Sequence, residues 1–141
     1  DTPYTYETLA PKGLAVGSGA IVVLDDSVCI VEYIQKVFEF FVHESCGKCT
    51  PCRLGTTRIL ELLTDFVEGR AKDGDVERLE YMARQVSQLS ACGLGQSVNV
   101  ALMSALRHRR GDFEANINGG ACPAGAFACH ENGRNKACLT I

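Results

Sequence analysis

The sequence predicts a mainly α fold, a small four-helix bundle with a short strand before it and an irregular cysteine-rich tail after it. Apolar residues recur at helical spacing in four segments between residues 31 and 110. Short connections join these segments, which favours a bundle of antiparallel helices. After Gly111 the amphipathic pattern stops, and residues 116–138 are rich in glycine, alanine and asparagine.

The composition is that of an ordinary globular domain. Of the 141 residues 46% are hydrophobic and 22% are charged, and the net charge is −3. These values allow a real core and indicate neither a nucleic-acid partner nor an anionic membrane surface. We therefore expect no nucleic acid, no transmembrane segment and no signal peptide.

Residues 13–28 predict a turn that leads into a short strand. Gly17 and Gly19 flank a serine, a β-branched run follows, and an Asp-Asp-Ser turn closes it. A single strand is not stable alone, so we expect it to join a sheet made by upstream sequence or to pair near residues 5–9.

The first two helices are predicted on either side of a cysteine-rich connection. The first runs from Val31 to about His43, with Val31, Ile34, Phe38 and Phe41 on one face. The second begins near Pro51, a residue suited to a first helical turn, and reaches about Val67. Its apolar face consists of Leu54, Ile59, Leu62, Leu63 and Phe66.

The third and fourth helices are separated by a glycine-rich interruption at residues 92–95. Asp75 is the expected N-cap of the third helix, which carries Val76, Leu79, Met82, Val86 and Leu89 on one face. The fourth begins near Val98. We expect it to end in the basic run 107–110, because cations in a last turn followed by Gly111 are a helix-stop signal.

Eight cysteines indicate metal chemistry rather than cross-links. They are Cys29, Cys46, Cys49, Cys52, Cys92, Cys122, Cys129 and Cys138. An even number is compatible with disulfides, but a spacing of two intervening residues is typical of metal ligands. We therefore expect the protein in a reducing compartment, the cytoplasm. Peripheral attachment to a membrane complex remains an alternative.

Cys46, Cys49 and Cys52 can occupy three corners of a cubane, because each short loop turns the next thiolate toward the same point. A [4Fe–4S] cluster needs four thiolates. Cys92 is the predicted fourth ligand. In a bundle, the connections after the first and the third helix lie at the same end, so the topology brings Cys92 to the other three.

Four neighbouring residues suit such a cluster. Gly47 lets backbone amides point at sulfur, and Gly93 removes side-chain bulk beside Cys92. Lys48 and Arg53 offset the negative charge of thiolates and sulfides and thereby help to set the reduction potential.

Two alternatives remain open at this point. The first is a zinc site with four cysteine ligands that holds a structural scaffold, although zinc sites prefer two separated ligand pairs. The second is a fragment of a radical enzyme with an open-iron cluster, which would keep three ligands at a different spacing.

The segment ESCGKCTPCRLG at residues 44–55 resembles the iron–sulfur signature of the NADH-binding flavoprotein subunit of respiratory complex I. The same module occurs in NAD-linked hydrogenases and formate dehydrogenases. The element at residues 92–95 also matches, and the resemblance covers about residues 1–115. It implies that residues 1–30 end a ubiquitin-like β domain of SLBB type and that residues 31–112 form a helical [4Fe–4S] domain.

The resemblance implies a relay that passes single electrons between flavin mononucleotide, reduced by NAD(P)H, and the clusters of partner subunits. One of these partners is expected to be a thioredoxin-like [2Fe–2S] subunit. The glycine-rich flavin- and NADH-binding segments of the family are absent from this sequence. We therefore expect FMN and NAD(P) in the full subunit but not on this segment, and no catalytic residue within it.

The tail, residues 113–141, carries a second set of candidate ligands, Cys122, Cys129, His130 and Cys138. Three cysteines and a histidine suit Zn²⁺, and a second iron–sulfur cluster with a partner's ligand is the alternative. The tail is similar to the cysteine-rich hinge in flavin subunits of electron-bifurcating [FeFe] hydrogenases. It therefore favours a multimeric hydrogenase over respiratory complex I or a formate dehydrogenase.

Two further residues are assigned to packing rather than to chemistry. Cys29, after the predicted strand, is expected to be a small buried hydrophobic residue. His43 is expected to be a helix-end histidine rather than a neighbour of the cluster.

Overall fold

The computed structural model describes residues 2–14, 16–17, 19–119 and 123–124. Its main body consists of four long helices, α2 (Ile30–Glu44), α3 (Thr50–Val67), α4 (Asp75–Leu89) and α6 (Val98–Ala115). Three short helices accompany them, α1 (Tyr6–Leu9), the 3₁₀ helix η1 (Ala10–Lys12) and α5 (Gly93–Gln96). The predicted mainly helical fold is confirmed.

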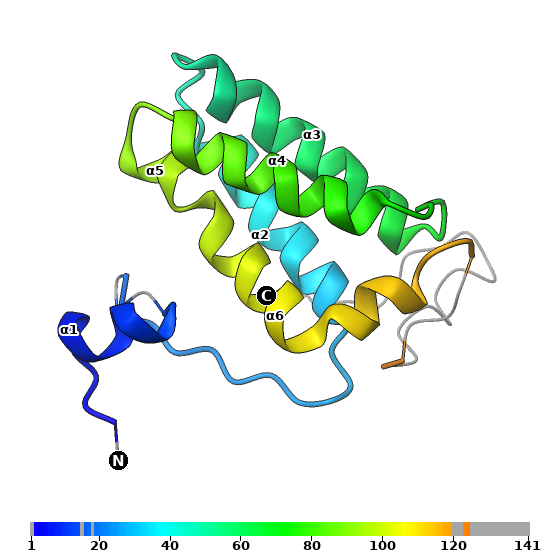
Figure 1. Ribbon diagram of the computed structural model, residues 1–141, viewed down its shortest axis with the longest axis horizontal. Helices are drawn as coiled ribbons and strands as arrows, with labels where there is room; N and C mark the ends of the chain where they lie inside the picture. The colour runs from blue at the N-terminus through cyan, green and yellow to red at the C-terminus, as the bar shows by residue number, and fades with distance from the viewer. Residues whose placement is uncertain (1, 15, 18, 120–122, 125–141) are drawn as a thin grey trace.

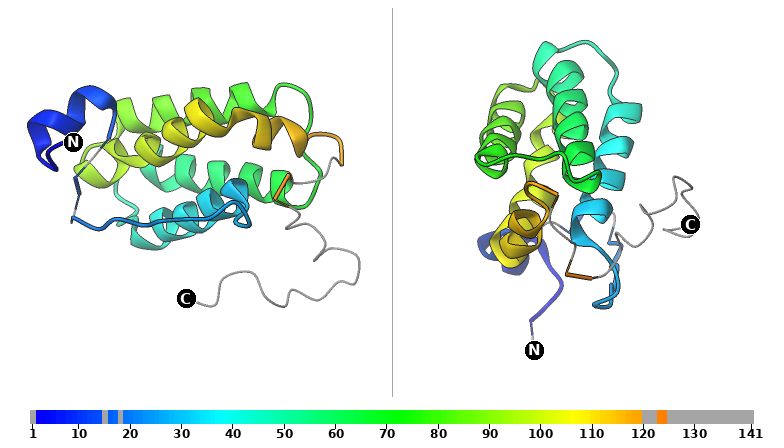
Figure 2. Two further views of the ribbon diagram at one scale, coloured as in Figure 1. Left: turned by 90° about the horizontal axis from the view of Figure 1, so that it is seen from below. Right: turned by 90° about the vertical axis from the view of Figure 1, so that its right-hand side faces the viewer.

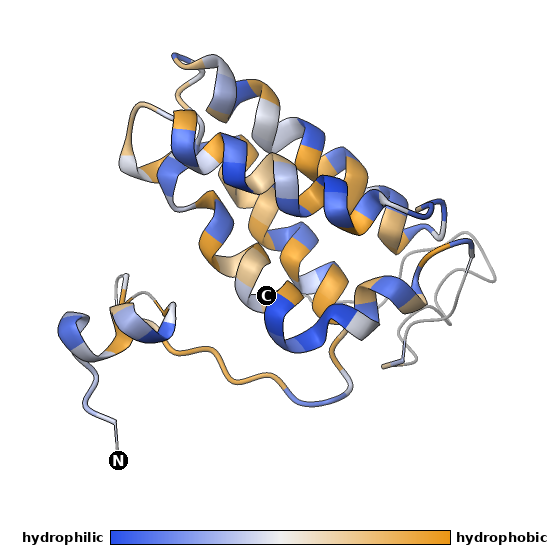
Figure 3. Ribbon diagram, viewed as in Figure 1, coloured by the Kyte–Doolittle hydropathy of each residue, from blue (hydrophilic) through white to orange (hydrophobic). Residues whose placement is uncertain are grey.

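The four long helices form a closed bundle. Helix α2 packs against α3 and α6, and α4 packs against the same two helices from the other side (Figures 1 and 2). Most of the apolar residues turn inward, while polar residues cover much of the outside of the helices (Figure 3). Leu54 and Leu89, expected on the buried faces, are instead 53% and 62% exposed. Phe38, Phe66 and Phe113 are fully buried, and the rings of Phe66 and Phe113 meet edge to face with centroids 5.9 Å apart.

The start of α4 differs by one residue from the prediction. Gly74, with φ of +89°, is the N-cap, and Asp75 is the first helical residue. The Asp75 carboxylate accepts a hydrogen bond from the Lys72 N–H at 2.9 Å and pairs with Arg78 at 2.8 Å. Asp75 therefore stabilises the first turn of α4 as its first helical residue rather than as its N-cap.

The predicted end of the last helix is confirmed only as a break. Arg109, within the basic run, has non-helical dihedrals, and a second helical stretch follows this kink, so that α6 continues past Gly111 to Ala115. Phe113, in the final turn, is fully buried against Phe66. Burial of this ring outweighs the local stop signal, because helices in proteins owe most of their stability to tertiary packing.

No strand forms among the described residues, contrary to the strand expected within residues 13–28. Residues 5–9, the proposed pairing partner, instead enter helix α1, which Thr5 caps. Ile21, Val22 and Val23 run in an extended, exposed segment that is strongly apolar (Figure 3). The apolar run has no neighbouring strand in this part of the chain, so no ladder can form.

The segment before α2 lies along α6 (Figure 1). A β-carbon on Gly13 would lie 2.9 Å from a guanidinium nitrogen of Arg107, and Asp26 lies 3.9 Å from Arg109. Cys29 ends this segment and is 3% exposed within the core, which confirms the expectation of a small buried residue. Among the described helices, none is long and apolar enough to cross a lipid bilayer.

Candidate iron–sulfur site

Two connections of the bundle meet at one of its ends (Figure 1). The connection from α2 to α3 carries Cys46 and Cys49, and Cys52 follows in the first turn of α3. The connection from α4 to α5 carries Cys92. The two are in contact, since the backbone of Ala91 lies within hydrogen-bonding reach of Cys49. The helices that follow them also approach closely, because a β-carbon on Gly95 of α5 would lie 3.2 Å from the Cβ of Cys52 in α3. The expectation that these connections share one end of the bundle is confirmed.

Cys49 occupies the N-cap position of α3 and is half-buried. The backbone N–H groups of Ala91 and Cys52, with a smaller contribution from the hydroxyl of Ser90, lower the pKa of the Cys49 thiol. Two of these donors belong to the α4–α5 connection. One loop thus stabilises a thiolate on the other, and the thiolate is the form that binds metal.

Cys52 is the most buried of the four candidate ligands, at 4% exposure. Its sulfur lies 3.4 Å from Oγ of Ser45, and its carbonyl accepts a hydrogen bond from the Thr56 hydroxyl at 2.8 Å. Ser45 also accepts from the N–H of Gly47 at 3.4 Å. The loop is therefore folded back onto the start of α3.

Gly47 has a φ of +73°, in the left-handed region, so glycine is needed for this turn. Its carbonyl accepts a hydrogen bond from Nη1 of Arg53 at 3.4 Å. Lys48, beside it, is exposed. Both cations expected near the cluster therefore lie at the cysteine loop. Arg53 is hydrogen-bonded to the backbone of the loop, and Lys48 is exposed to solvent.

Cys46 and Cys92 are exposed. Cys46, Cys49, Cys52 and Cys92 form no disulfide in the part of the chain that the structure describes. Within the same residues, no three His, Cys, Asp or Glu side chains are arranged so that they could hold a single metal ion. The structure thus brings the loops together without showing a closed ligand set.

The Gly-Leu-Gly element after Cys92 was expected to remove side-chain bulk, and its second glycine is the crowded one. A β-carbon on Gly95 would lie 2.3 Å from Oγ of Ser90, whereas one on Gly93 would meet nothing within 4 Å. The role of Gly93 beside Cys92 stays a prediction. The contact of Gly95 could not be predicted, because it depends on where Ser90 lies.

The surroundings of the Ser90 hydroxyl indicate whether the site fits an iron–sulfur cluster. Ser90 is 5% exposed, and its oxygen has no well-directed hydrogen bond among the described residues, although it lies close enough to Cys49 to affect that thiol. A buried hydroxyl needs a hydrogen-bond partner, and thiolate or sulfide sulfur at this position would accept a hydrogen bond from it. The donor set and the thiols therefore fit an anionic iron–sulfur group.

Other predicted residues lie away from this chemistry or outside the described residues. His43 is exposed, with Nδ1 3.0 Å from Glu44, which agrees with a helix-end histidine. The four tail candidates lie outside the described residues: Cys122, Cys129, His130 and Cys138.

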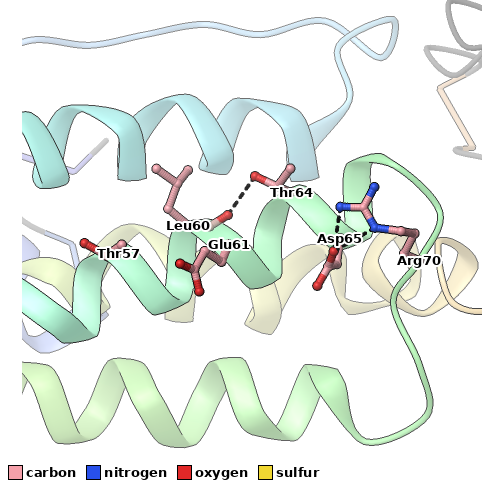
Figure 4. Close-up of a pocket in the computed structure, with 6 residues that line it drawn as sticks. All are labelled: Thr57, Leu60, Glu61, Thr64, Asp65 and Arg70. Atoms are coloured by element: carbon pink, nitrogen blue, oxygen red, sulfur yellow. Dashed lines mark hydrogen bonds and ion pairs between the residues drawn. The ribbon is translucent and has the colours of Figure 1, made fainter.

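A pocket of about 400 Å³ along the second half of α3 offers no comparable chemistry (Figure 4). Asp65 pairs with Arg70 at 2.8 Å, and the Thr64 hydroxyl donates to the Leu60 carbonyl at 2.9 Å. Gln35 donates to the same hydroxyl at 2.9 Å. Glu61 pairs with Arg58 and the Thr57 hydroxyl donates to the Arg53 carbonyl, so the polar side chains of this pocket already have partners. The cysteine end therefore remains the candidate site.

Comparisons with known proteins agree with this choice. The crystal structure of an NAD⁺-reducing [NiFe]-hydrogenase in the H₂-reduced state matches with a TM-score of 0.65 and 31% identity, over 81% of this chain and 21% of that chain. The structure of the air-oxidized state matches with a TM-score of 0.63 and 35% identity, over 67% of this chain and 17% of that chain.

Curated relatives include components of two kinds of enzyme. The F 2 component of the NADH-quinone oxidoreductase of Rhizobium meliloti (strain 1021) is 39% identical over 84% of this chain and 28% of its own length. The HndC component of the NADP-reducing hydrogenase of Solidesulfovibrio fructosivorans is 34% identical over 88% and 25%. The chain thus spans about a quarter of the length of these relatives.

The family match covers the bundle and both cysteine loops. The profile described as "NADH-ubiquinone oxidoreductase-F iron-sulfur binding region" matches residues 32–116, which run from the first turn of α2 to the end of α6. The chain belongs to this family of NADH-ubiquinone oxidoreductase-F iron–sulfur binding regions.

Proposed function

We propose that Cys46, Cys49, Cys52 and Cys92 ligate one [4Fe–4S] cluster that relays electrons. The observation that carries this proposal is the contact between the two cysteine loops, where the Ala91 N–H and the Ser90 hydroxyl lie against Cys49. Each thiolate of a cubane binds a different iron, so the sulfurs stand farther apart than around a single ion. When bound, such a cluster accepts and releases one electron at a time.

The surrounding residues favour the anionic form of Cys49. The N–H of Ala91 and the hydroxyl of Ser90 favour the thiolate of Cys49. Lys48 and Arg53 add positive charge at the loop that carries three ligands. Because they stabilise the more negative, reduced state, these groups raise the reduction potential.

For the whole protein we propose an NAD(P)H-linked flavin and iron–sulfur oxidoreductase in which this module passes electrons between FMN and the clusters of partner subunits. FMN and NAD(P) would bind to parts of the subunit outside this chain. The tail and the NADP-reducing hydrogenase relative support a multimeric, bifurcating hydrogenase with a thioredoxin-like [2Fe–2S] subunit. Placement in the cytoplasm belongs to the same proposal.

A respiratory NADH-quinone oxidoreductase is the second candidate, since the relative from Rhizobium meliloti carries that name. A formate dehydrogenase would use the same module. Identification by mass spectrometry of the subunits that purify with the intact complex separates these candidates, because only the hydrogenase contains a hydrogen-activating subunit.

The segment before α2 supports a further part of the proposal. We infer that residues 1–30 end a β domain of the parent subunit. Ile21, Val22 and Val23 are between 63% and 89% exposed in an extended conformation, which suits a strand that pairs with other sequence.

We also propose a second metal site in the tail, with Cys122, Cys129, His130 and Cys138 as ligands of Zn²⁺ or of a second cluster. The ligand types support this site. The Cys129→Ala variant should lose the tail metal while the visible absorption of the main cluster stays unchanged. Unaltered total metal content would remove Cys129 from the ligand set.

The test of the main site is Cys92→Ser in the full chain, compared with Cys29→Ala as a control that also removes one thiol. Cys92→Ser should lose iron and sulfide while its helix content, followed by circular dichroism, stays the same. Cys29→Ala should keep the cluster. Full iron content in Cys92→Ser would exclude Cys92 as a ligand.

A further inference from the structure

The two less exposed candidate ligands each have a serine hydroxyl beside them. Cys52 is 4% exposed, and its sulfur lies 3.4 Å from Oγ of Ser45. Cys49 is half-buried, and the Ser90 hydroxyl lies within hydrogen-bonding reach of it. Ser45 belongs to the connection between α2 and α3, and Ser90 to the connection between α4 and α5. Each cysteine loop therefore supplies one hydroxyl to the less exposed side of the site.

The direction of the hydrogen bond at Ser45 follows from the chemistry of its partner. A thiolate that binds metal carries no proton, so it can only accept a hydrogen bond. The Ser45 oxygen already accepts one from the N–H of Gly47 at 3.4 Å. The hydroxyl proton of Ser45 is therefore available to the sulfur of Cys52.

The backbone of Ser90 is fully hydrogen-bonded, which leaves only its hydroxyl for the site. Its N–H donates to the Val86 carbonyl at 3.0 Å, and its carbonyl accepts from Nε2 of Gln96 at 3.2 Å. The Ser87 hydroxyl donates to the Gln96 carbonyl at 2.6 Å and so holds this glutamine in place. The Ser90 hydroxyl is buried without a well-directed partner among the described residues, and a ligand sulfur would supply the acceptor that it needs.

The other two candidate ligands do not need a protein hydroxyl. Cys46 and Cys92 are exposed, so water can donate hydrogen bonds to their sulfurs. Water reaches the buried Cys52 far less, and a protein group must take its place there. The positions of Ser45 and Ser90 agree with this difference in burial.

Neighbouring hydroxyls are engaged elsewhere. The side chains that donate to backbone carbonyls instead are those of Thr56, Thr57, Ser87 and Ser97. Ser97 donates to the Leu94 carbonyl at 2.9 Å, within the short helix α5. It therefore offers a matched control, a serine near the site whose hydroxyl points away from the sulfurs.

We propose that Ser45 and Ser90 donate hydrogen bonds to the two less exposed ligand sulfurs and thereby raise the reduction potential of the cluster. This inference rests on the proposed function, because it concerns the same cluster. A hydrogen bond draws negative charge away from a ligand sulfur, so it favours the more negative, reduced state. Because the contacts of Gln96 fix the position of Ser90, this donor is in place before the cluster is reduced.

The first test is the reduction potential of the full chain, purified without oxygen, and of its serine variants. A titration with dithionite followed by electron paramagnetic resonance measures it. Ser45→Ala and Ser90→Ala should each make reduction less favourable by up to about tenfold, and tenfold is about 59 mV for a one-electron couple. Ser97→Ala should leave the potential unaltered. Wild-type potentials in both Ser45→Ala and Ser90→Ala would overturn the proposal.

Two further variants separate the hydroxyl of Ser45 from the shape of its side chain. Threonine keeps the hydroxyl, whereas valine has the same shape as threonine without it. Ser45→Thr should keep the wild-type potential, and Ser45→Val should show the lower potential of Ser45→Ala. Should Ser45→Val hold no iron while Ser45→Thr holds it, the hydroxyl serves to fold the loop through Gly47, and the proposal fails.

Pulsed electron–nuclear double resonance of the reduced cluster detects the donors directly. After exchange into D₂O, the wild type should show deuterons that couple to the electron spin of the cluster. Part of this coupling should disappear in Ser45→Ala and in Ser90→Ala, but not in Ser97→Ala. Identical deuteron couplings in all four proteins would show that neither hydroxyl points at a sulfur.

The iron and acid-labile sulfide of the wild type distinguish this inference from the proposed function. A wild type that binds neither would sink the proposed function. A wild type that holds the cluster, with a potential that responds to neither serine, would overturn this inference and leave the proposed function intact.

Discussion

Single residues decide how closely the two cysteine loops approach each other. Gly95 lets α5 lie against Cys52 of α3, and Ser90 in the α4–α5 connection places a buried hydroxyl beside Cys49. These contacts join the two cysteine loops and the helices that follow them. The site therefore depends on the packing of the loops as much as on the cysteines.

Gly95→Ala should open this contact, because the new β-carbon would lie 2.3 Å from Oγ of Ser90. We expect a loss of about 1–3 kcal/mol in the free energy of unfolding, the range of overpacked sites, and lower iron content. Gly93→Ala is the control, since that position is open. Thermal unfolding and iron analysis check both variants, and equal behaviour of the two would refute the steric argument.

Lys48→Glu should lower the reduction potential of the cluster, because it replaces a positive charge by a negative one beside the ligand loop. Lys72→Glu makes the same charge change in the α3–α4 connection, at the other end of the bundle, and should leave the potential almost unaltered (Figure 1). A redox titration followed by electron paramagnetic resonance measures both. A higher potential in Lys48→Glu would contradict the charge argument.

At the scale of the elements, α6 shows how tertiary packing extends a helix beyond its local signals. The basic run and Gly111 predict the break at Arg109 but not the second helical stretch that continues to Ala115. Phe113 holds the last turn against Phe66, and the following residues pair with Ala71 through the hydrogen bond from the Asn118 N–H to its carbonyl at 2.9 Å. The end of the bundle opposite the cysteines is closed in this way.

Phe113→Ala should lower the free energy of unfolding by about 3–5 kcal/mol, the usual cost of removing a buried aromatic ring. Phe40→Ala should cost less than about 1 kcal/mol, because that ring is 57% exposed. Chemical denaturation followed by circular dichroism gives both values. Similar midpoints for the two variants would show that the last turn of α6 contributes little.

The helices could be predicted from the sequence because their signals are local. Helices α2, α3 and α4 follow from apolar periodicity and appear within a residue or so of the expected bounds. Residues 13–28 were expected to form a strand from their β-branched run, but a strand needs a partner, and the described chain supplies none.

The order of the helices predicts which connections meet at the site, but not how closely they pack. Spacing and helix order placed Cys92 beside the other three cysteines, and the loops do share one end of the bundle. The crowding at Gly95 and the unpaired hydroxyl of Ser90 could not be predicted, because both depend on the exact packing of the loops.

The whole molecule has two unlike ends. One carries the cysteine loops with the basic residues Lys48 and Arg53, while the other is closed by the α3–α4 connection and the end of α6 (Figure 1). This polarity suits a relay module, since the candidate ligands gather at one end of the bundle. The chain spans about a quarter of the length of its relatives, and the remaining functions of the enzyme are proposed to lie outside it.

The central claim is that four thiolates hold an iron–sulfur cubane. Element-resolved metal analysis of the full chain, purified without oxygen and assayed for acid-labile sulfide, tests it most directly. The account predicts iron with an equal amount of sulfide, and a paramagnetic signal on reduction by dithionite. Zinc without sulfide, bound through Cys46, Cys49 and Cys52, would contradict it.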